Sequence, residues 1–124
     1  MPKPPALVVD DYASMRSVVV EVLKSAGFTD IHQAGNGRMA LAKLAEFKKI
    51  GLIISDWYMP EMDGLELLRA VRANPQTAQI PMLMITAEGQ RCNVLDAMQS
   101  GATGYIVKPF APQALQERLL TMFP

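Results

Sequence analysis

Leu52-Ile53-Ile54-Ser55-Asp56 is a short apolar run that ends abruptly in two polar residues. Three apolar residues in succession leave no polar face, and so short a run is typical of a strand that is buried on both sides in a parallel sheet. We therefore predict a central strand here, with the carboxylate of Asp56 at its carboxyl end.

Three further runs have the same form, and a fourth is weaker. They occupy residues 6–9, 82–85 and 105–107 and, more weakly, 31–34. The segments between them repeat apolar residues every three or four positions, as amphipathic helices do. In the fourth such segment, Val94, Leu95 and Met98 form the expected apolar stripe, and Gly101 is suited to end the helix. Pro112 suits the first turn of the fifth helix.

Strands that alternate with helices along the whole chain indicate an α/β fold. The 124 residues are enough for one domain. We therefore predict a single domain over residues 1–124, a doubly wound parallel sheet of five strands with five helices on its two faces. No linker or low-complexity tract interrupts the pattern.

Charge and composition indicate which partners and which compartment to expect. Twelve basic and twelve acidic residues cancel, so nothing favours direct binding to nucleic acid or to an anionic membrane. The single cysteine, Cys92, excludes an internal disulfide and fits a reducing compartment. The only histidine, His32, is expected to be solvated. With no signal peptide or membrane span visible, we expect a soluble cytoplasmic protein. We also expect a monomer, since no sizeable apolar surface stripe is left unassigned.

Polar side chains stand where four of the predicted strands end or shortly after. These are Asp10, Asp11, Asp56, Thr86 and Lys108. The carboxyl ends of parallel strands meet at one edge of the sheet, and ligands bind there. The fold should therefore gather three carboxylates, one hydroxyl and one ammonium group.

This set of groups suits phosphoryl chemistry with a metal ion. Clustered carboxylates repel one another unless a cation neutralises them, and oxygen ligands suit Mg²⁺. A carboxylate can itself accept a phosphoryl group, in a reaction that needs mainly alignment and charge neutralisation. A single aspartate at a strand end is more often a helix cap, so only the joint placement favours a magnesium and phosphoryl site.

Four segments resemble the signature segments of response-regulator receiver domains. They are Leu7-Val8-Val9-Asp10-Asp11, Ser55-Asp56-Trp57-Tyr58-Met59-Pro60-Glu61-Met62-Asp63-Gly64, Ile85-Thr86-Ala87-Glu88 and Gly104-Tyr105-Ile106-Val107-Lys108-Pro109-Phe110. The likeness runs from about Ala6 to the C-terminus, and the Ser-Asp-Trp-Tyr-Met-Pro stretch is similar to single-domain chemotaxis (CheY-like) regulators in particular. The resemblance implies the flavodoxin-like strand order 2-1-3-4-5.

The resemblance also implies a role for each polar residue at the strand ends. Asp56 would accept a phosphoryl group from a sensor histidine kinase. Asp11 and Asp56 would bind Mg²⁺ directly, together with the backbone carbonyl of Tyr58, and Asp10 would hold the ion through water. Lys108 would contact the phosphoryl group.

A switch at the surface follows from the same resemblance. Thr86 would move toward the phosphoryl group and Tyr105 would turn inward, which would reshape the face of the last two helices and the last strand. A partner would read this face, expected at Val94, Tyr105, Val107 and Arg118. In the chemotaxis type the partners include a flagellar motor switch protein and a phosphatase.

One position departs from the family pattern. The second residue after the acceptor is often small or polar in chemotaxis regulators, whereas here it is Tyr58. Its ring is expected near the approach of a hydrolytic water. Our hypothesis is that Tyr58, with Glu88 near the same approach, slows self-dephosphorylation.

Two other functions fit the sequence less well than a switch. Aspartyl-phosphate phosphatases carry a second aspartate two residues after the nucleophile, but Tyr58 stands there, so we expect a regulatory phosphoacceptor that assists its own turnover and not an enzyme. A flavodoxin-like electron carrier is disfavoured because acidic Asp10-Asp11 replaces its phosphate loop. A receiver domain excised from a larger regulator, and a phosphate sink or adaptor, stay open as alternatives.

Overall fold

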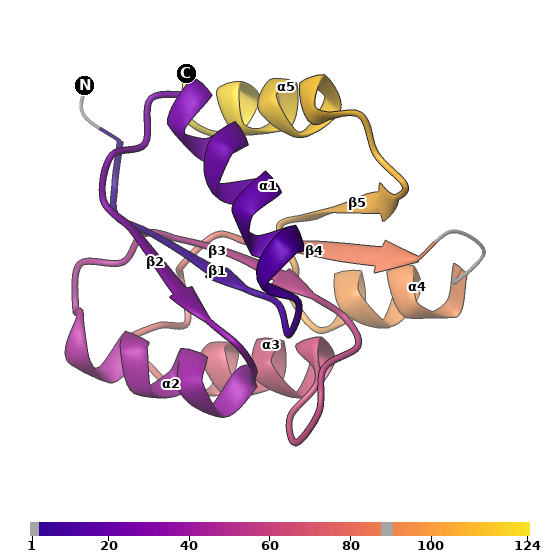
Figure 1. Ribbon diagram of the computed structural model, residues 1–124. Helices are drawn as coiled ribbons and strands as arrows, with labels where there is room; N and C mark the ends of the chain where they lie inside the picture. The colour runs from indigo at the N-terminus through magenta and orange to yellow at the C-terminus, as the bar shows by residue number, and fades with distance from the viewer. Residues whose placement is uncertain (1–2, 88–90) are drawn as a thin grey trace.

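The computed structural model describes residues 3–87 and 91–124 and confirms the predicted sheet. The five strands are β1 (Ala6–Val9), β2 (Ile31–Ala34), β3 (Leu52–Asp56), β4 (Met82–Ala87) and β5 (Gly104–Lys108). They stand side by side in the order β2-β1-β3-β4-β5, and every neighbouring pair is parallel (Figure 1). The predicted strand order is therefore confirmed.

Helices cover both faces of the sheet. On one face lie α1 (Ala13–Ser25) and α5 (Pro112–Met122), and on the other lie α2 (Gly37–Glu46), α3 (Gly64–Ala73) and α4 (Arg91–Gln99) (Figure 1). Successive residues of a strand point to opposite faces, so a sheet covered twice needs apolar residues at every position. In β3, Ile53 packs toward α2 and α3, while Leu52 and Ile54 pack toward α1 and α5.

Capping and turn residues mark the points where the helices begin and end. Asp63 caps α3 by accepting from the Glu66 amide at 2.8 Å, and the Glu66 carboxylate accepts in return from the Asp63 amide. Gly101 follows α4 with a φ of +101°, a conformation that favours glycine. Pro112 lies in the first turn of α5, as predicted.

The apolar stripe predicted for α4 is wrong. Leu95 is 63% exposed and Met98 is 44% exposed, whereas Ala97 is buried against the sheet. The sequence offered overlapping faces at helical spacing, and the small side chain of Ala97 forms the inward one. The exposed pair also removes the support for a monomer, because that expectation assumed that no apolar stripe was left on the surface.

His32 differs from its prediction as well. Its ring stacks on Phe47 with centroids 4.2 Å apart, and its Nε2 lies 3.0 Å from Oδ1 of Asp30. The side chain is largely covered instead of solvated.

None of the helices in the described part of the chain is both long and apolar enough to span a bilayer.

Candidate functional site

The structure brings the polar residues of the strand ends together. Asp56 is the last residue of β3, Thr86 is the fifth of the six residues of β4, and Lys108 ends β5. Asp10 and Asp11 follow β1, the neighbour of β3. Carboxylate oxygens of the three aspartates all lie within 4.8 Å of one another. The predicted gathering at one edge of the sheet is confirmed.

An ion pair connects two of these strand ends. Nζ of Lys108 lies 3.0 Å from Oδ1 of Asp56, whose side chain is only 8% exposed. The same oxygen accepts a hydrogen bond from the Trp57 amide at 2.9 Å. Among the described residues, the buried negative charge therefore has a cation and an amide donor, as a buried carboxylate requires.

Asp10 is a buried carboxylate with a raised pKa. Its side chain is buried, Oδ1 accepts from the Tyr12 amide at 2.9 Å, and Oδ2 has no hydrogen-bond partner among the described residues. Burial, opposed by the Tyr12 amide and reinforced by the negative charge of Asp56, raises the pKa of Asp10 from 3.8 to about 6. Arg16 donates to the Asp10 carbonyl at 2.7 Å and so fixes the backbone there.

Thr86 carries the second buried polar atom that lacks a partner. Thr86 is 2% exposed, and no described group forms a hydrogen bond with its hydroxyl. Leaving a buried hydroxyl or carboxylate oxygen unsatisfied is unfavourable, so such groups need an explanation such as an ion or a ligand. Three clustered carboxylates, one with an unsatisfied oxygen, fit the oxygen-rich shell of Mg²⁺.

Glycine shapes the backbone beside Asp56. The amide of Gly64 donates to the Trp57 carbonyl at 2.7 Å, which folds the segment 57–63 back on itself. A Cβ at Gly64 would lie 2.3 Å from the Asp56 carbonyl oxygen. Only glycine therefore allows α3 to begin so close to the acidic residues, a constraint of the folded loop that the sequence pattern alone did not reveal.

A pocket of about 520 Å³ opens over the acidic residues. The two tyrosines on its rim, Tyr12 and Tyr58, are both more than half exposed. The other groups that line it come from the ends of four strands and from the loop after β3: Asp11, Asp56, Met59, Pro60, Asp63, Ala87 and Lys108. The pocket therefore connects Asp56 with the solvent. Glu88, the predicted companion of Tyr58, lies outside the described residues.

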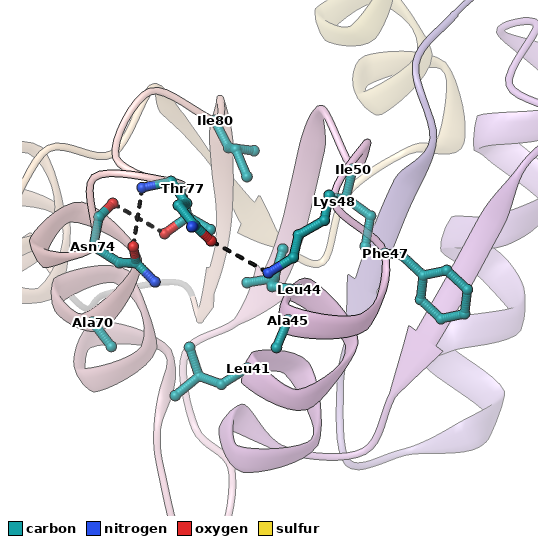
Figure 2. A pocket seen from close by; sticks show the side chains of 11 residues that line it. Leu41, Leu44, Ala45, Phe47, Lys48, Ile50, Ala70, Asn74, Thr77 and Ile80 are labelled. Carbon is teal, nitrogen blue, oxygen red and sulfur yellow. Dashed lines mark hydrogen bonds between the residues drawn. The ribbon is translucent and has the colours of Figure 1, made fainter.

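A larger pocket, of about 750 Å³, lies elsewhere, between α2 and the loop before β4 (Figure 2). Polar groups that line it already have partners: Lys48 donates to the Gln76 side chain at 3.3 Å, and Thr77 donates to the Val71 carbonyl at 2.7 Å. The floor is aliphatic. Size alone therefore does not make it the reactive site.

The predicted partner face is open to solvent in part. Tyr105 is 39% exposed, and Val107 lies on the same side of β5 two residues later. The guanidinium of Arg118 lies over Gly104, where a Cβ would come within 2.1 Å of it. Val94, in α4, is partly buried.

Residues 6–120 match the response regulator receiver domain family. The chain belongs to the response-regulator receiver family. This receiver is 41% identical over 117 residues to the chemotaxis protein CheY of Pseudomonas aeruginosa, an alignment that covers 94% of each chain. It is 43% identical over 113 residues to the chemotaxis protein CheY1 of Helicobacter pylori strain J99, with 91% of each covered.

Solved structures give the same result for this receiver. The chemotaxis response regulator CheY4 of Vibrio cholerae superimposes with a TM-score of 0.86 at 39% identity, covering 96% of this chain and 98% of that one. The protein is a receiver domain of the CheY chemotaxis type, a two-component signalling switch. Receivers of this type are regulatory phosphoacceptors, and receiver domains in general bind Mg²⁺.

Proposed function

We propose that Asp56 of this receiver takes a phosphoryl group from a sensor histidine kinase. The observation that carries the proposal is the Lys108–Asp56 ion pair of 3.0 Å at the edge of a cluster of three carboxylates. One oxygen of Asp56 is held by Lys108 and by the Trp57 amide, so we assign the attack to the other oxygen, Oδ2. A P–O bond to Asp56 forms as the P–N bond of the phosphohistidine breaks, and the imidazole leaves.

The carboxylates would hold the metal on which the reaction depends. Asp11, Asp56 and the Tyr58 carbonyl are the proposed direct ligands of Mg²⁺, and Asp10 holds it through water. The ion supplies positive charge that offsets the charge of the incoming phosphoryl oxygens. Lys108 offers its ammonium to one of those oxygens, and the Thr86 hydroxyl donates to another.

The output of the switch would lie on the face of α4, β5 and α5. Donation by Thr86 to the phosphoryl group draws the end of β4 inward, and the exposed ring of Tyr105 follows. The altered face, around Val94, Val107 and Arg118, would then bind a target. A flagellar motor switch protein is the proposed target and a phosphatase a further partner, which places the receiver in the cytoplasm.

We propose that residues 1–124 form one receiver domain and that this domain acts as a switch. A phosphate sink would share the phosphoryl site but would need no ordered change at Tyr105. Comparison of the Tyr105 signals in NMR spectra with and without beryllofluoride, which mimics a phosphoryl group on aspartate, separates the two. A shift at Tyr105 supports the switch, and changes confined to the acidic residues favour the sink.

Intact mass after incubation with acetyl phosphate and Mg²⁺ tests the phosphoryl site. The parent should gain one phosphoryl group, and the Asp56→Asn variant should gain none. Chelation of Mg²⁺ should abolish the gain in the parent. If the parent gains nothing, or if both proteins gain equally, Asp56 is not the acceptor.

A further inference from the structure

The loop between β3 and α3 contains a strained turn. The Met62 amide donates to the Pro60 carbonyl at 2.8 Å, and Glu61 between them has a φ of +69°. A hydrogen bond across three residues with positive φ in the middle is a γ-turn of the rare, strained kind. A residue other than glycine holds such a conformation only where its surroundings fix it.

The surroundings that fix this turn belong to α2. Nδ2 of Asn36 donates to Oε2 of Glu61 at 3.0 Å, and Oδ1 of the same amide caps α2 by accepting from the Met39 amide at 2.9 Å. Next to it, Met62 packs directly on the first turn of the helix, where a Cβ at Gly37 would lie 2.6 Å from Cγ of Met62. The side chain of Asn36 therefore ties the loop after β3 to the N-terminus of α2.

This tie acts on the segment that begins next to the acceptor. The loop runs from Trp57 to Asp63 and is closed by the bond from the Gly64 amide to the Trp57 carbonyl, so it moves largely as a unit. Tyr58 lies three residues before Glu61 in the same closed loop. A change in the tilt of the loop therefore moves the Tyr58 carbonyl relative to the carboxylates of Asp11 and Asp56.

We propose that the Asn36–Glu61 hydrogen bond positions the loop after β3 for magnesium binding, so that Asn36 and Glu61 set the affinity of the unphosphorylated receiver for the ion. This inference rests on the proposed function, because it takes the Tyr58 carbonyl as a ligand. Both residues act through the loop, as positioning residues, and neither touches the ion.

Two exchanges of amide for carboxylate make a matched test. Asn36→Asp keeps the cap of α2, since both residues are good N-caps, but replaces the NH₂ donor with an oxygen that repels Glu61. Glu61→Gln keeps an acceptor for Asn36. The double variant N36D/E61Q restores a hydrogen bond in the opposite direction and has the same formal charge as the parent.

The direction of the change in Mg²⁺ affinity distinguishes a positioning role from a simple effect of charge. Added negative charge near the site would by itself tighten Mg²⁺ binding. Positioning predicts the reverse: Asn36→Asp weakens binding by roughly three- to tenfold, the scale of one lost hydrogen bond. Glu61→Gln should bind nearly as the parent does, and N36D/E61Q should regain the parent affinity.

The dissociation constant of Mg²⁺ is measured by calorimetry on the unphosphorylated proteins, with Asp11→Asn as the control for the site itself. Unchanged or tighter binding by Asn36→Asp, or a double variant as weak as that single one, overturns the inference. If the inference fails in this way but Asp11→Asn has lost Mg²⁺ binding, the metal site of the proposed function still stands. If the parent does not bind Mg²⁺, or if Asp11→Asn binds as the parent does, the proposed metal site fails and the inference with it.

Discussion

The ammonium of Lys108 and the carboxylate of Asp56 lie 3.0 Å apart although β4 stands between the two strands that carry them. Lys108 reaches across the end of β4, where Thr86 is buried. One cation therefore connects the proposed acceptor with β4, the strand that carries Thr86, and the phosphoryl group is expected to take over this cation.

Loss of Lys108 should slow phosphorylation. Lys108→Met keeps the length of the side chain and removes the charge that would stabilise the transferring group. Removing one such preorganised partner typically lowers a rate by about a hundredfold. The rate of phosphorylation by acetyl phosphate should fall on that order while Mg²⁺ binding is retained. A rate within a factor of about two of the parent would exclude a role for Lys108 in transfer.

The Thr86 hydroxyl should lower the stability of the receiver while being needed for the switch. Its buried hydroxyl has no described partner, so Thr86→Val, which has nearly the same shape, should raise the free energy of unfolding by about 1 kcal/mol. The same variant should lose the beryllofluoride-induced NMR shift of Tyr105, whereas Thr86→Ser should keep it. Urea unfolding and NMR measure the two effects. A less stable valine variant would mean that the hydroxyl has a partner in solution.

Asp10 should make the metal-free receiver less stable as pH rises. Its folded-state pKa of about 6 lies above the unfolded value of 3.8. Its contribution is therefore fully favourable below about pH 4 and is lost as pH rises through 6. Asp10→Asn should be more stable than the parent at pH 7 by on the order of 2 kcal/mol, with the difference vanishing near pH 4. Urea unfolding in a chelator measures this. A difference that is the same at both pH values would refute the assignment.

Gly64 should tolerate no side chain. Gly64→Ala would place a Cβ 2.3 Å from the Asp56 carbonyl oxygen, so the start of α3 has to shift. We expect a loss of about 1–3 kcal/mol in the free energy of unfolding, together with weaker Mg²⁺ binding. Gly35→Ala is the control, because its added carbon meets nothing closer than 3.6 Å. Equal unfolding midpoints for the two variants would contradict the crowding.

Tyr58 should lengthen the life of the phosphorylated state. Its ring is 54% exposed on the rim of the pocket over Asp56, and we expect the hydrolytic water to enter through this pocket. Replacing it with the smaller Tyr58→Asn side chain should shorten the phosphoryl half-life several-fold, as followed by intact mass after removal of the donor. If the half-life does not change, the tyrosine does not shield the site.

Much of this architecture could be predicted because its signals are local. Apolar runs such as 52–54 identify strands, and polar residues at the ends of parallel strands must share an edge of the sheet. The gathering of Asp10, Asp56 and Lys108 therefore followed from the pattern, and the family resemblance supplied the strand order. The proposed roles of these residues stay predictions.

The rest depends on contacts between distant segments, which the pattern does not contain. Ala97 and not Leu95 faces the sheet, because the packing of α4 selects among overlapping apolar faces. His32 is covered because Phe47, fifteen positions away, stacks on it. The bond between Asn36 and Glu61 and the unsatisfied oxygens of Asp10 and Thr86 likewise appear only when the chain has folded.

Trapping of the phosphoryl group with borohydride, followed by peptide mass spectrometry, tests the central claim most directly. Borohydride reduces an aspartyl phosphate to homoserine, so the modified position can be read from the peptide that carries it. After incubation with acetyl phosphate and Mg²⁺, homoserine should appear at position 56 and nowhere else. Homoserine at another aspartate, or none in a protein that binds Mg²⁺, would contradict the assignment of Asp56 as the acceptor.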